Sequence, residues 1–191
     1  MLHHLRPAIV MMIAFTLLTG VIYPLAITGI AQIIAPTAAN GSMIVKDGKV
    51  IGSSLVGQAF TSDKYFHPRP SAAGNGYDGS SSSGSNLGPI TQKLLDRVKA
   101  DVDALRAQGV TGSIPVDAVT ASASGLDPDI SPATALMQVP RVAKARNMPE
   151  EAVRKLVEAE IQWPVLGVFG EPRVNVLLLN MALDAAGAGP A

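Results

Sequence analysis

The chain has 191 residues, which is enough for one soluble domain besides a membrane anchor. Its 15 basic and 15 acidic side chains cancel and are interspersed, so we expect no nucleic acid or other polyanion as a partner. Because there is no cysteine, disulfides, a thiolate nucleophile and cysteine-ligated zinc are excluded.

Residues 7–35 form an apolar run, and no Asp, Glu, Lys or Arg lies between Arg6 and Lys46. The run exceeds the roughly 20 residues that a helix needs to cross about 30 Å of hydrocarbon. Two alternatives fit less well. A cleaved signal peptide would have an apolar region about half as long, and a buried soluble helix would carry charges on one face. We therefore predict a single transmembrane helix.

The charges that flank this run predict its orientation. His3, His4 and Arg6 precede it, and no charge follows until Lys46. The positive-inside rule then places the N-terminus in the cytoplasm. We predict a cytoplasmic N-terminus with the anchor at residues 1–35 and a soluble extracytoplasmic domain at 36–191, in a bacterial inner (plasma) membrane.

Within the anchor, Pro24 removes one backbone hydrogen bond and should kink the helix unless Thr19 or Gly20 accommodates it. Thr16, Gly20 and Pro24 are spaced by four and place small groups on one face. Such a face lets another transmembrane helix approach closely, so we predict partner docking there.

The first part of the soluble domain alternates turn signals with short periodic segments. Residues 40–60 read as a β-hairpin whose turn contains Asp47-Gly48, a pair suited to positive φ. Residues 61–90 are rich in Ser, Gly, Pro and Asn and predict a long surface loop, functional or mobile. Residues 91–108 have helical spacing and predict a half-buried helix, with Thr91 able to cap it.

The C-terminal half predicts further short elements. Residues 116–121 indicate a strand, and Ser131-Pro132 is typical of a helix start, although Pro140 should interrupt or bend that helix. A third helix is expected from Pro149 onward. Residues 165–169 suggest another strand. Residues 174–183 are ambiguous between strand and helix and fit a helix slightly better. The domain is thus expected to be α/β or α+β with short mixed strands.

No hydrolytic or metal-binding pattern emerges. A catalytic triad would depend on His67 alone, and neither a histidine pair nor an Asp-rich loop with Ca²⁺ spacing is present in the outer domain. A free-standing membrane-tethered hydrolase would depend on that one histidine. Beside it, Pro68 and Pro70 stiffen a loop that carries Arg69. An exposed Arg69 there would lose little entropy on docking to a partner.

Two hydroxyl-rich segments invite an anion-binding interpretation. Residues 83–89 precede a helix, where backbone amides can hold an anion, although a flexible loop explains them too. They lack the Lys-Ser/Thr of a phosphate-binding loop. Residues 120–128 are explained more simply by capping and turns.

A series of motifs in order along nearly the whole chain resembles the C subunit of the bacterial Kdp potassium-transporting P-type ATPase. The family is similar at Leu5-Arg6-Pro7, Tyr23-Pro24, Asn40-Gly41-Ser42, Gly57-Gln58-Ala59-Phe60, Tyr65–Ala72, Gly84-Ser85-Asn86-Leu87, Val119–Asp127, Ile130-Ser131-Pro132, Val139–Arg146, Gly170–Val176 and Leu183-Asp184. The chain departs from the family pattern at residues 159–164.

This resemblance implies a non-catalytic accessory subunit of an ATP-driven potassium importer, embedded in membrane lipid. Its partners would be a channel-like potassium-binding subunit and a catalytic P-type ATPase subunit. The family is also described as a catalytic chaperone that raises the affinity of the ATPase subunit for ATP. That role conflicts with the predicted topology, because ATP is cytoplasmic. The candidate nucleotide-binding residues are Gly84, Ser85, Asn86, Ser124, Gly125 and Gln138.

Overall fold

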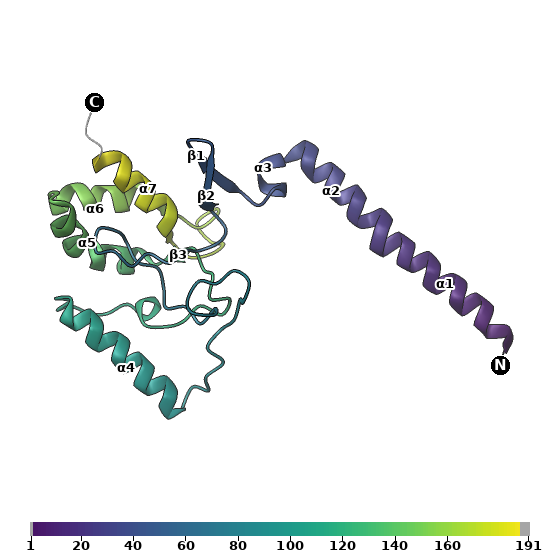
Figure 1. The fold of residues 1–191 in the computed structure, drawn as a ribbon, viewed down its shortest axis with the longest axis horizontal. Helices are drawn as coiled ribbons and strands as arrows, with labels where there is room; N and C mark the ends of the chain where they lie inside the picture. Colours follow the sequence, from purple (N-terminus) through teal and green to yellow (C-terminus); the bar gives the residue numbers. More distant parts are fainter. Residues whose placement is uncertain (1, 188–191) are drawn as a thin grey trace. The chain divides into compact units, whose positions relative to one another are not determined.

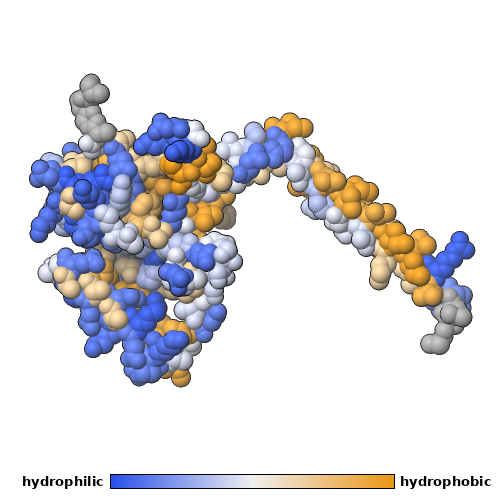
Figure 2. All heavy atoms as spheres, viewed as in Figure 1, coloured by the Kyte–Doolittle hydropathy of each residue, from blue (hydrophilic) through white to orange (hydrophobic). Residues whose placement is uncertain are grey.

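The computed structural model describes residues 2–187, and the chain divides between Ser53 and Ser54 into two compact units. The first unit begins with η1 (Leu2–His4) and a long helix made of α1 (Leu5–Leu17), the π-helical turn η2 (Leu18–Ile22) and α2 (Tyr23–Ile34) (Figure 1). These 30 residues of α1, η2 and α2 are long and apolar enough to cross a membrane, and none of their side chains is buried. Apolar side chains run along this helix in Figure 2.

The helix accommodates Pro24 through a π-helical turn. Proline lacks an N–H, and its ring conflicts with the carbonyl four residues earlier. Here the N–H of Tyr23 donates to the carbonyl of Leu18, five residues back, which widens the turn before the ring. The Thr19 hydroxyl donates to a main-chain carbonyl one turn earlier at 2.7 Å. The π-helical turn contains both Thr19 and Gly20, the residues expected to accommodate Pro24, and the helix continues without a break.

The predicted hairpin follows a single helical turn, α3 (Pro36–Ala39). Strands β1 (Met43–Lys46) and β2 (Lys49–Ser53) pair antiparallel. Asp47 and Gly48 have φ of 51° and 74°, the backbone that a tight two-residue turn requires. The hairpin prediction is therefore confirmed.

The second unit is a small α/β domain. Its three-stranded sheet has the order β3-β5-β4 with antiparallel pairs, so the predicted class is right but the described strands are not mixed. In Figure 1, α5, α6 and α7 lie together and α4 lies apart from them. The elements are α4 (Gln92–Ala107), η3 (Val116–Ala118), β3 (Asp129–Ile130), α5 (Pro132–Arg146), α6 (Glu150–Ala159), β4 (Ile161–Gln162), β5 (Arg173–Asn175) and α7 (Val176–Gly187).

The helix predictions are largely confirmed by local chemistry. Ser131 caps α5 by accepting from the N–H of Thr134 at 3.0 Å. Glu150 and Glu151 open α6, and residues 176–187 form α7. Thr91 precedes α4 as predicted, but its hydroxyl donates to a loop carbonyl rather than capping the helix.

Two local predictions are wrong, and a third is wrong in part. Pro140 does not interrupt α5, because the fully buried Val139 and Val142 on either side keep the helix packed against the core, and a bend at Pro140 stays a prediction. Residues 116–121 contain the short turn η3 instead of a strand. Residues 165–169 close back on themselves through the single bridge Val165–Phe169, so this apolar segment is an exposed loop.

One cluster of buried apolar side chains forms the core, and one member does not belong to a helix or strand. Phe66 comes from the predicted long loop, which contains no helix or strand between residues 61 and 90, and it is completely buried. The other members come from the sheet and from α5–α7: Ile130, Ala135, Val139, Val142, Ala143, Val153, Val157, Val174, Val176, Leu179 and Leu183.

Two buried amide side chains hold the long loop where Phe66 enters the core. Asn180 accepts from the N–H of Phe66 at 2.8 Å and donates to its carbonyl at 3.0 Å. Gln138 accepts from the N–H of His67 at 2.7 Å and donates to its carbonyl at 3.0 Å. Asn180 from α7 and Gln138 from α5 thus satisfy both polar groups of two successive residues, as a neighbouring β-strand would.

Two arginines fix the same segment from its other side. Arg141 donates to the main-chain carbonyls of Asp63 and Tyr65, at 2.8 and 3.0 Å. Arg146 donates to the carbonyl of Lys64 at 2.7 Å, and its guanidinium lies 4.7 Å from the centre of the Tyr65 ring. Charged donors strengthen these hydrogen bonds, so the path of the loop is determined before it reaches Arg69.

Close backbone contacts hold the rest of the long loop. A Cβ at Gly57 would lie 2.5 Å from the carbonyl oxygen of Asp127, and one at Gly84 would lie 2.8 Å from that of Ala123. Gly125 has φ of 68°, and a Cβ there would lie 2.7 Å from three atoms of the loop. Only glycine permits approaches this close.

We predict that Asn180→Leu lowers the free energy of unfolding of the full chain by about 2–5 kcal/mol, because the N–H and carbonyl of Phe66 then stay buried without partners. Urea denaturation in detergent, followed by circular dichroism, measures the change. As a matched control, Gln92→Leu removes an exposed amide that bonds only the Asp96 side chain, and it should change stability by less than about 0.5 kcal/mol. A loss below about 1 kcal/mol for Asn180→Leu would contradict the role assigned to the amide.

We predict that Gly125→Ala destabilises the fold by about 2–5 kcal/mol, since an unfavourable positive φ adds to overpacking against the loop. Gly76 also has a positive φ, of 106°, but no atom lies within 4 Å of a Cβ built there. Gly76→Ala therefore measures the cost of the positive φ alone, about 1–2 kcal/mol. Gly79→Ala, with ordinary φ and no neighbour within 4 Å, should be neutral. The same denaturation assay ranks the three, and equal effects for Gly125→Ala and Gly76→Ala would rule out the close contact.

Candidate functional site

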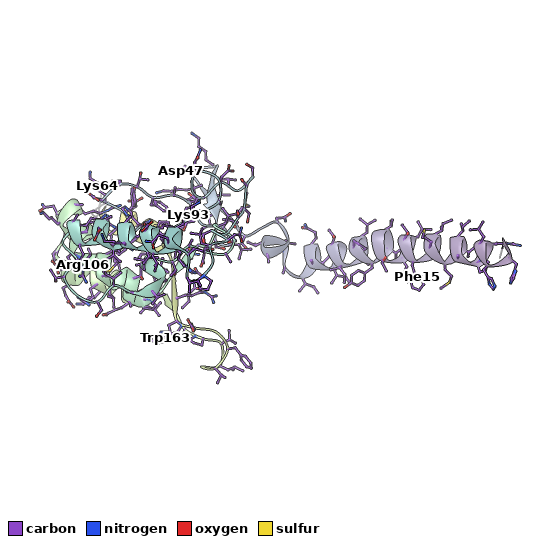
Figure 3. All side chains as sticks on the ribbon, turned by 90° about the horizontal axis from the view of Figure 1, so that it is seen from below. Phe15, Asp47, Lys64, Lys93, Arg106 and Trp163 are labelled. Atoms are coloured by element: carbon purple, nitrogen blue, oxygen red, sulfur yellow. The ribbon has the colours of Figure 1, made fainter. Side chains whose placement is uncertain are left out.

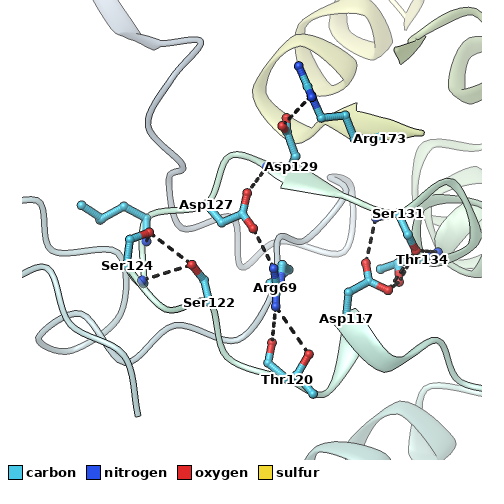
Figure 4. Close-up of polar contacts among 12 residues, drawn as sticks. Arg69, Asp117, Thr120, Ser122, Ser124, Asp127, Asp129, Ser131, Thr134 and Arg173 are labelled. Atoms are coloured by element: carbon cyan, nitrogen blue, oxygen red, sulfur yellow. Dashed lines mark hydrogen bonds and ion pairs between the residues drawn. The ribbon is translucent and has the colours of Figure 1, made fainter. Parts of the chain in front are cut away.

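Arg69 lies at the centre of a polar cluster that joins the long loop to the segment between η3 and β3 (Figure 4). One guanidinium nitrogen, Nη1, is 2.7 Å from Oδ2 of Asp127, and Nη2 is 3.5 Å from both the carbonyl and the hydroxyl of Thr120. Only 25% of the Arg69 side chain is exposed. The expectation of an exposed Arg69 is therefore wrong, because the fold supplies a carboxylate from 58 residues away that holds the charge.

The main chain of Arg69 is held as well. Its carbonyl accepts from the Tyr77 hydroxyl at 2.8 Å. Burial and the nearby Asp127 carboxylate raise the pKa of Tyr77, so the phenol keeps its proton and remains a donor. The other carboxylate oxygen of Asp127 accepts from the N–H of Asp129 at 3.0 Å. Asp127 thus connects the Arg69 loop to the start of β3.

Two further carboxylates complete the cluster in Figure 4. Asp129 lies 3.0 Å from Nε of Arg173, and burial raises the pKa of Asp129 while the Arg173 charge partly offsets that shift. Asp117 accepts from the N–H of Ser131 at 2.7 Å and from the Thr134 hydroxyl at 2.8 Å, at the positive end of α5. Both acids have structural partners in this arrangement.

Beside these residues lies a cavity of about 530 Å³, and its charges disfavour a nucleotide. Two arginines and four acids line it, and the acids outnumber the bases by two. The lining charged residues are Arg69, Arg173, Asp117, Asp127, Asp129 and Glu171. The phosphates of ATP would meet net negative charge. Among the described residues, no group of three or more His, Asp or Glu is placed to hold a metal ion.

The structure brings some of the predicted nucleotide-binding residues together. Gly84 packs against the segment that contains Ser124 and Gly125. Two backbone amides of these segments are engaged. The N–H of Gly125 donates to the Ser122 hydroxyl at 3.2 Å, and the N–H of Ser83 donates to the Ser124 carbonyl at 3.0 Å. These residues therefore serve loop-to-loop packing here.

The remaining predicted nucleotide-binding residues lie elsewhere or point to their own loop. The Asn86 amide donates to the carbonyl of Gly84 at 3.2 Å, next to Ser85. The Gln138 side chain binds the main-chain N–H and carbonyl of His67, and its oxygen also accepts from Arg141 at 2.7 Å. Gln138 lines two other cavities, of about 580 and 260 Å³, between α5 and the region of α4, and the other five predicted residues line neither.

His67, the residue on which a hydrolase would depend, has a structural contact. Its Nε2 lies 3.1 Å from the main-chain carbonyl oxygen of Ser62. Burial and the neighbouring Arg141 charge lower the pKa of His67, which favours the neutral ring. A neutral ring with its proton on Nε2 donates to that carbonyl. The arrangement explains His67 without assigning it a reaction.

Sequence reasoning missed Asp127 and Gly57, although both position the cluster. Asp127 is the charge partner of Arg69, and Gly57 lies against the Asp127 backbone, with its N–H donating to the Leu126 carbonyl at 2.8 Å. Asp127 lies 58 positions after Arg69 and 70 positions after Gly57, and no local sequence pattern predicts contacts at such separations. The only available signal was that an arginine fixed between two prolines needs a carboxylate nearby.

Comparison with known proteins gives a full-length match. Residues 5–185 match the family described as KdpC: K+-transporting ATPase, c chain. The chain is 57% identical over 200 residues to the potassium-transporting ATPase KdpC subunit of Bradyrhizobium diazoefficiens, covering 98% of this chain and 100% of that protein. It is 60% identical over 186 residues to the Caulobacter vibrioides KdpC subunit, covering 97% and 94%. It is 61% identical over 189 residues to that of Allorhizobium ampelinum, covering 98% and 99%.

Both kinds of match extend from the apolar helix through α7, and they agree with the resemblance seen in the motifs. The chain belongs to the KdpC family, the c chain of the K+-transporting ATPase.

Proposed function

We propose that this chain is a non-catalytic subunit that stabilises the assembly of a potassium-importing ATPase and modulates its ATP-hydrolysing subunit. The observation that carries the proposal is the 30-residue apolar helix, of which no side chain is buried by the chain itself. A KdpC-family member with such a helix has a surface that only lipid and other membrane helices can cover.

In this proposal the helix Leu5–Ile34 spans the bacterial inner membrane once. The basic groups before it favour a cytoplasmic N-terminus, and the second unit is then extracytoplasmic. Its partners are a channel-like potassium-binding subunit and the catalytic P-type ATPase subunit, as family membership suggests. Membrane lipid covers the faces of the helix that these subunits leave free.

The docking face of the helix consists of Thr16, Gly20 and Pro24. A Cβ at Gly20 would have no neighbour within 4 Å, so the helix itself leaves this position open. The Thr19 hydroxyl is satisfied within the helix, which lets the widened turn enter lipid or protein without an unpaired donor. Close approach of a partner helix at Gly20 is the contact that we propose.

Arg69 contributes to docking in a form that differs from the expected one. Its charge is paired with Asp127, so it does not extend to a partner as a free cation. Its ion pair instead keeps the long loop and the segment between η3 and β3 in one arrangement, and a surface fixed before binding loses less entropy on docking.

Contact with ATP is the alternative role, and it stays a prediction. The packing of Gly84 against Ser124 and Gly125 places three candidate residues together, but the N–H groups of Ser83 and Gly125 are already engaged within the chain. The predicted topology also separates these residues from cytoplasmic ATP. Locating the second unit therefore bears on both roles.

We predict that Gly20→Leu in the full chain reduces its co-purification with the other complex subunits about tenfold, because a bulky side chain keeps a partner helix away and costs about 1.4 kcal/mol. Gly29→Leu is the matched control, since Gly29 is also unobstructed but lies nine residues further along, off the docking face. Pull-down from solubilised membranes measures both. Equal recovery of the two variants would eliminate the proposed face.

We predict that protease added to spheroplasts digests the second unit and removes a C-terminal epitope tag, while inverted membrane vesicles protect the tag. Immunoblotting reads the outcome, and a cytoplasmic marker protein reports whether the spheroplasts stay intact. Digestion only in inverted vesicles would place the second unit in the cytoplasm. That result would overturn the proposed orientation and reopen contact with ATP.

A further inference from the structure

The loop at residues 163–169, here called the Trp163 loop, carries five large apolar side chains that the second unit leaves mostly exposed. It connects β4 to β5, and Figure 3 shows Trp163 on a loop that extends away from the rest of the unit. Its large side chains are 68–85% exposed: Trp163 71%, Val165 68%, Leu166 85%, Val168 77% and Phe169 68%. Soluble proteins rarely leave so many neighbouring apolar side chains in water, so the loop is expected to have an occupant.

Charge is absent from the whole loop. Between Glu160 and Glu171 no residue is charged, and only Gln162 has a polar side chain. A protein-binding loop usually has a polar rim that sets register and specificity. Here the polar rim is missing within the loop, and the acids stand at its base. This distribution suits insertion of the tip into an apolar phase with the base remaining in water.

The loop pairs most of its backbone N–H groups within itself. The N–H of Val165 donates to the Phe169 carbonyl at 3.1 Å, and that of Phe169 donates back to Val165 at 3.0 Å. The N–H of Gly167 donates to the Pro164 carbonyl at 2.9 Å, and that of Val168 to the Val165 carbonyl at 3.2 Å. Pro164 has no N–H to satisfy. Backbone that enters lipid must pair its polar groups internally, and this turn pairs most of its donors.

The chain itself brings a lipid surface within reach, if the proposed membrane anchorage holds. Residues 35–53 connect the apolar helix to the second unit, and 19 residues extend at most roughly 65 Å. Every copy of the second unit is therefore held close to a bilayer. A tether of this kind raises the effective concentration of the lipid surface for even a weakly inserting loop.

We propose that the Trp163 loop inserts into the lipid surface of the membrane and forms a second membrane contact of the second unit. Trp163, with an apolar ring and one N–H, sits at the headgroup level, where tryptophan is enriched. Leu166, Val168 and Phe169 reach the acyl boundary. Glu160 and Glu171 stay in water, so zwitterionic lipid is favoured over anionic lipid. This inference rests on the proposed anchorage.

Trp163 is the only tryptophan of the chain and therefore reports on the loop alone. The full chain is reconstituted into phosphatidylcholine vesicles, with or without bromine on the acyl chains, and Trp163 emission is recorded. We expect emission at shorter wavelengths than in a water-exposed loop. We expect brominated lipid to remove about half or more of it, because bromine quenches on contact at the depth where tryptophan resides. Acrylamide in the water should quench weakly.

The double variant Leu166→Asp/Phe169→Asp should lose the quenching by brominated lipid and regain quenching by acrylamide. Ile90→Asp is the matched control, because Ile90 is a 91% exposed apolar residue outside the loop, and its variant should behave as the original chain. Flotation with the vesicles tests the anchor separately and should be unchanged in both variants.

Each other outcome overturns the insertion. If the chain floats with the vesicles but Trp163 emission is quenched by acrylamide and not by brominated lipid, the loop has no lipid contact. The proposed anchorage then stands without the insertion. If neither quencher reduces Trp163 emission, the loop is covered by protein, either a second copy or a partner subunit. Failure of the original chain to float would overturn the anchorage and the insertion together.

Discussion

The arrangement of the second unit depends on two side-chain amides that bind main chain. Asn180 and Gln138 satisfy the N–H and carbonyl groups of Phe66 and His67, which lie in a segment without helix or strand. Phe66 can be buried because these groups have partners, since burying peptide groups without them costs more than the aromatic ring contributes. The loop so fixed leads directly to Arg69.

Beyond Arg69, tertiary contacts hold segments whose composition is typical of flexible loops in one defined arrangement. The pair between Arg69 and Asp127 and the close contacts at Gly57, Gly84 and Gly125 hold the Ser- and Gly-rich segments against one another. In the same segments the N–H groups of Ser83 and Gly125 are engaged within the chain and are not available to an anion. The site is thus better suited to presenting a fixed surface to another subunit than to holding a nucleotide, which agrees with an accessory role in the K+-transporting ATPase.

The helix Leu5–Ile34 and the Trp163 loop both carry apolar side chains that the chain does not cover itself. None of the side chains of the helix is buried, and the large side chains of the loop are mostly exposed. The helix pairs its backbone groups through its regular bonds and the π-helical turn, and the loop pairs most of its N–H donors within its tight turn. Apolar surfaces whose backbone groups are largely paired are compatible with lipid, and both are proposed to meet the membrane.

Several elements followed from sequence because their causes are local. The apolar length of the helix, the Asp47-Gly48 turn and the Ser131 cap each depend on residues within one turn or one span. The motif series also indicated the family, because its motifs occur in order over nearly the whole chain. Strand predictions at 116–121 and 165–169 failed, since short apolar runs do not reveal whether a sheet edge is available to pair with them.

The meeting of distant groups could be known only from the folded chain. The sequence alone was enough to predict an apolar membrane-length helix, a hairpin, the helix cap at Ser131 and an arginine between two prolines. It did not determine that Asp127 would take the Arg69 charge, that Asn180 would hold Phe66, or that residues 163–169 would remain uncovered. Those outcomes depend on contacts between residues tens of positions apart. Hydrogen-bond partners at that separation produce no periodic pattern in the sequence from which they could be predicted.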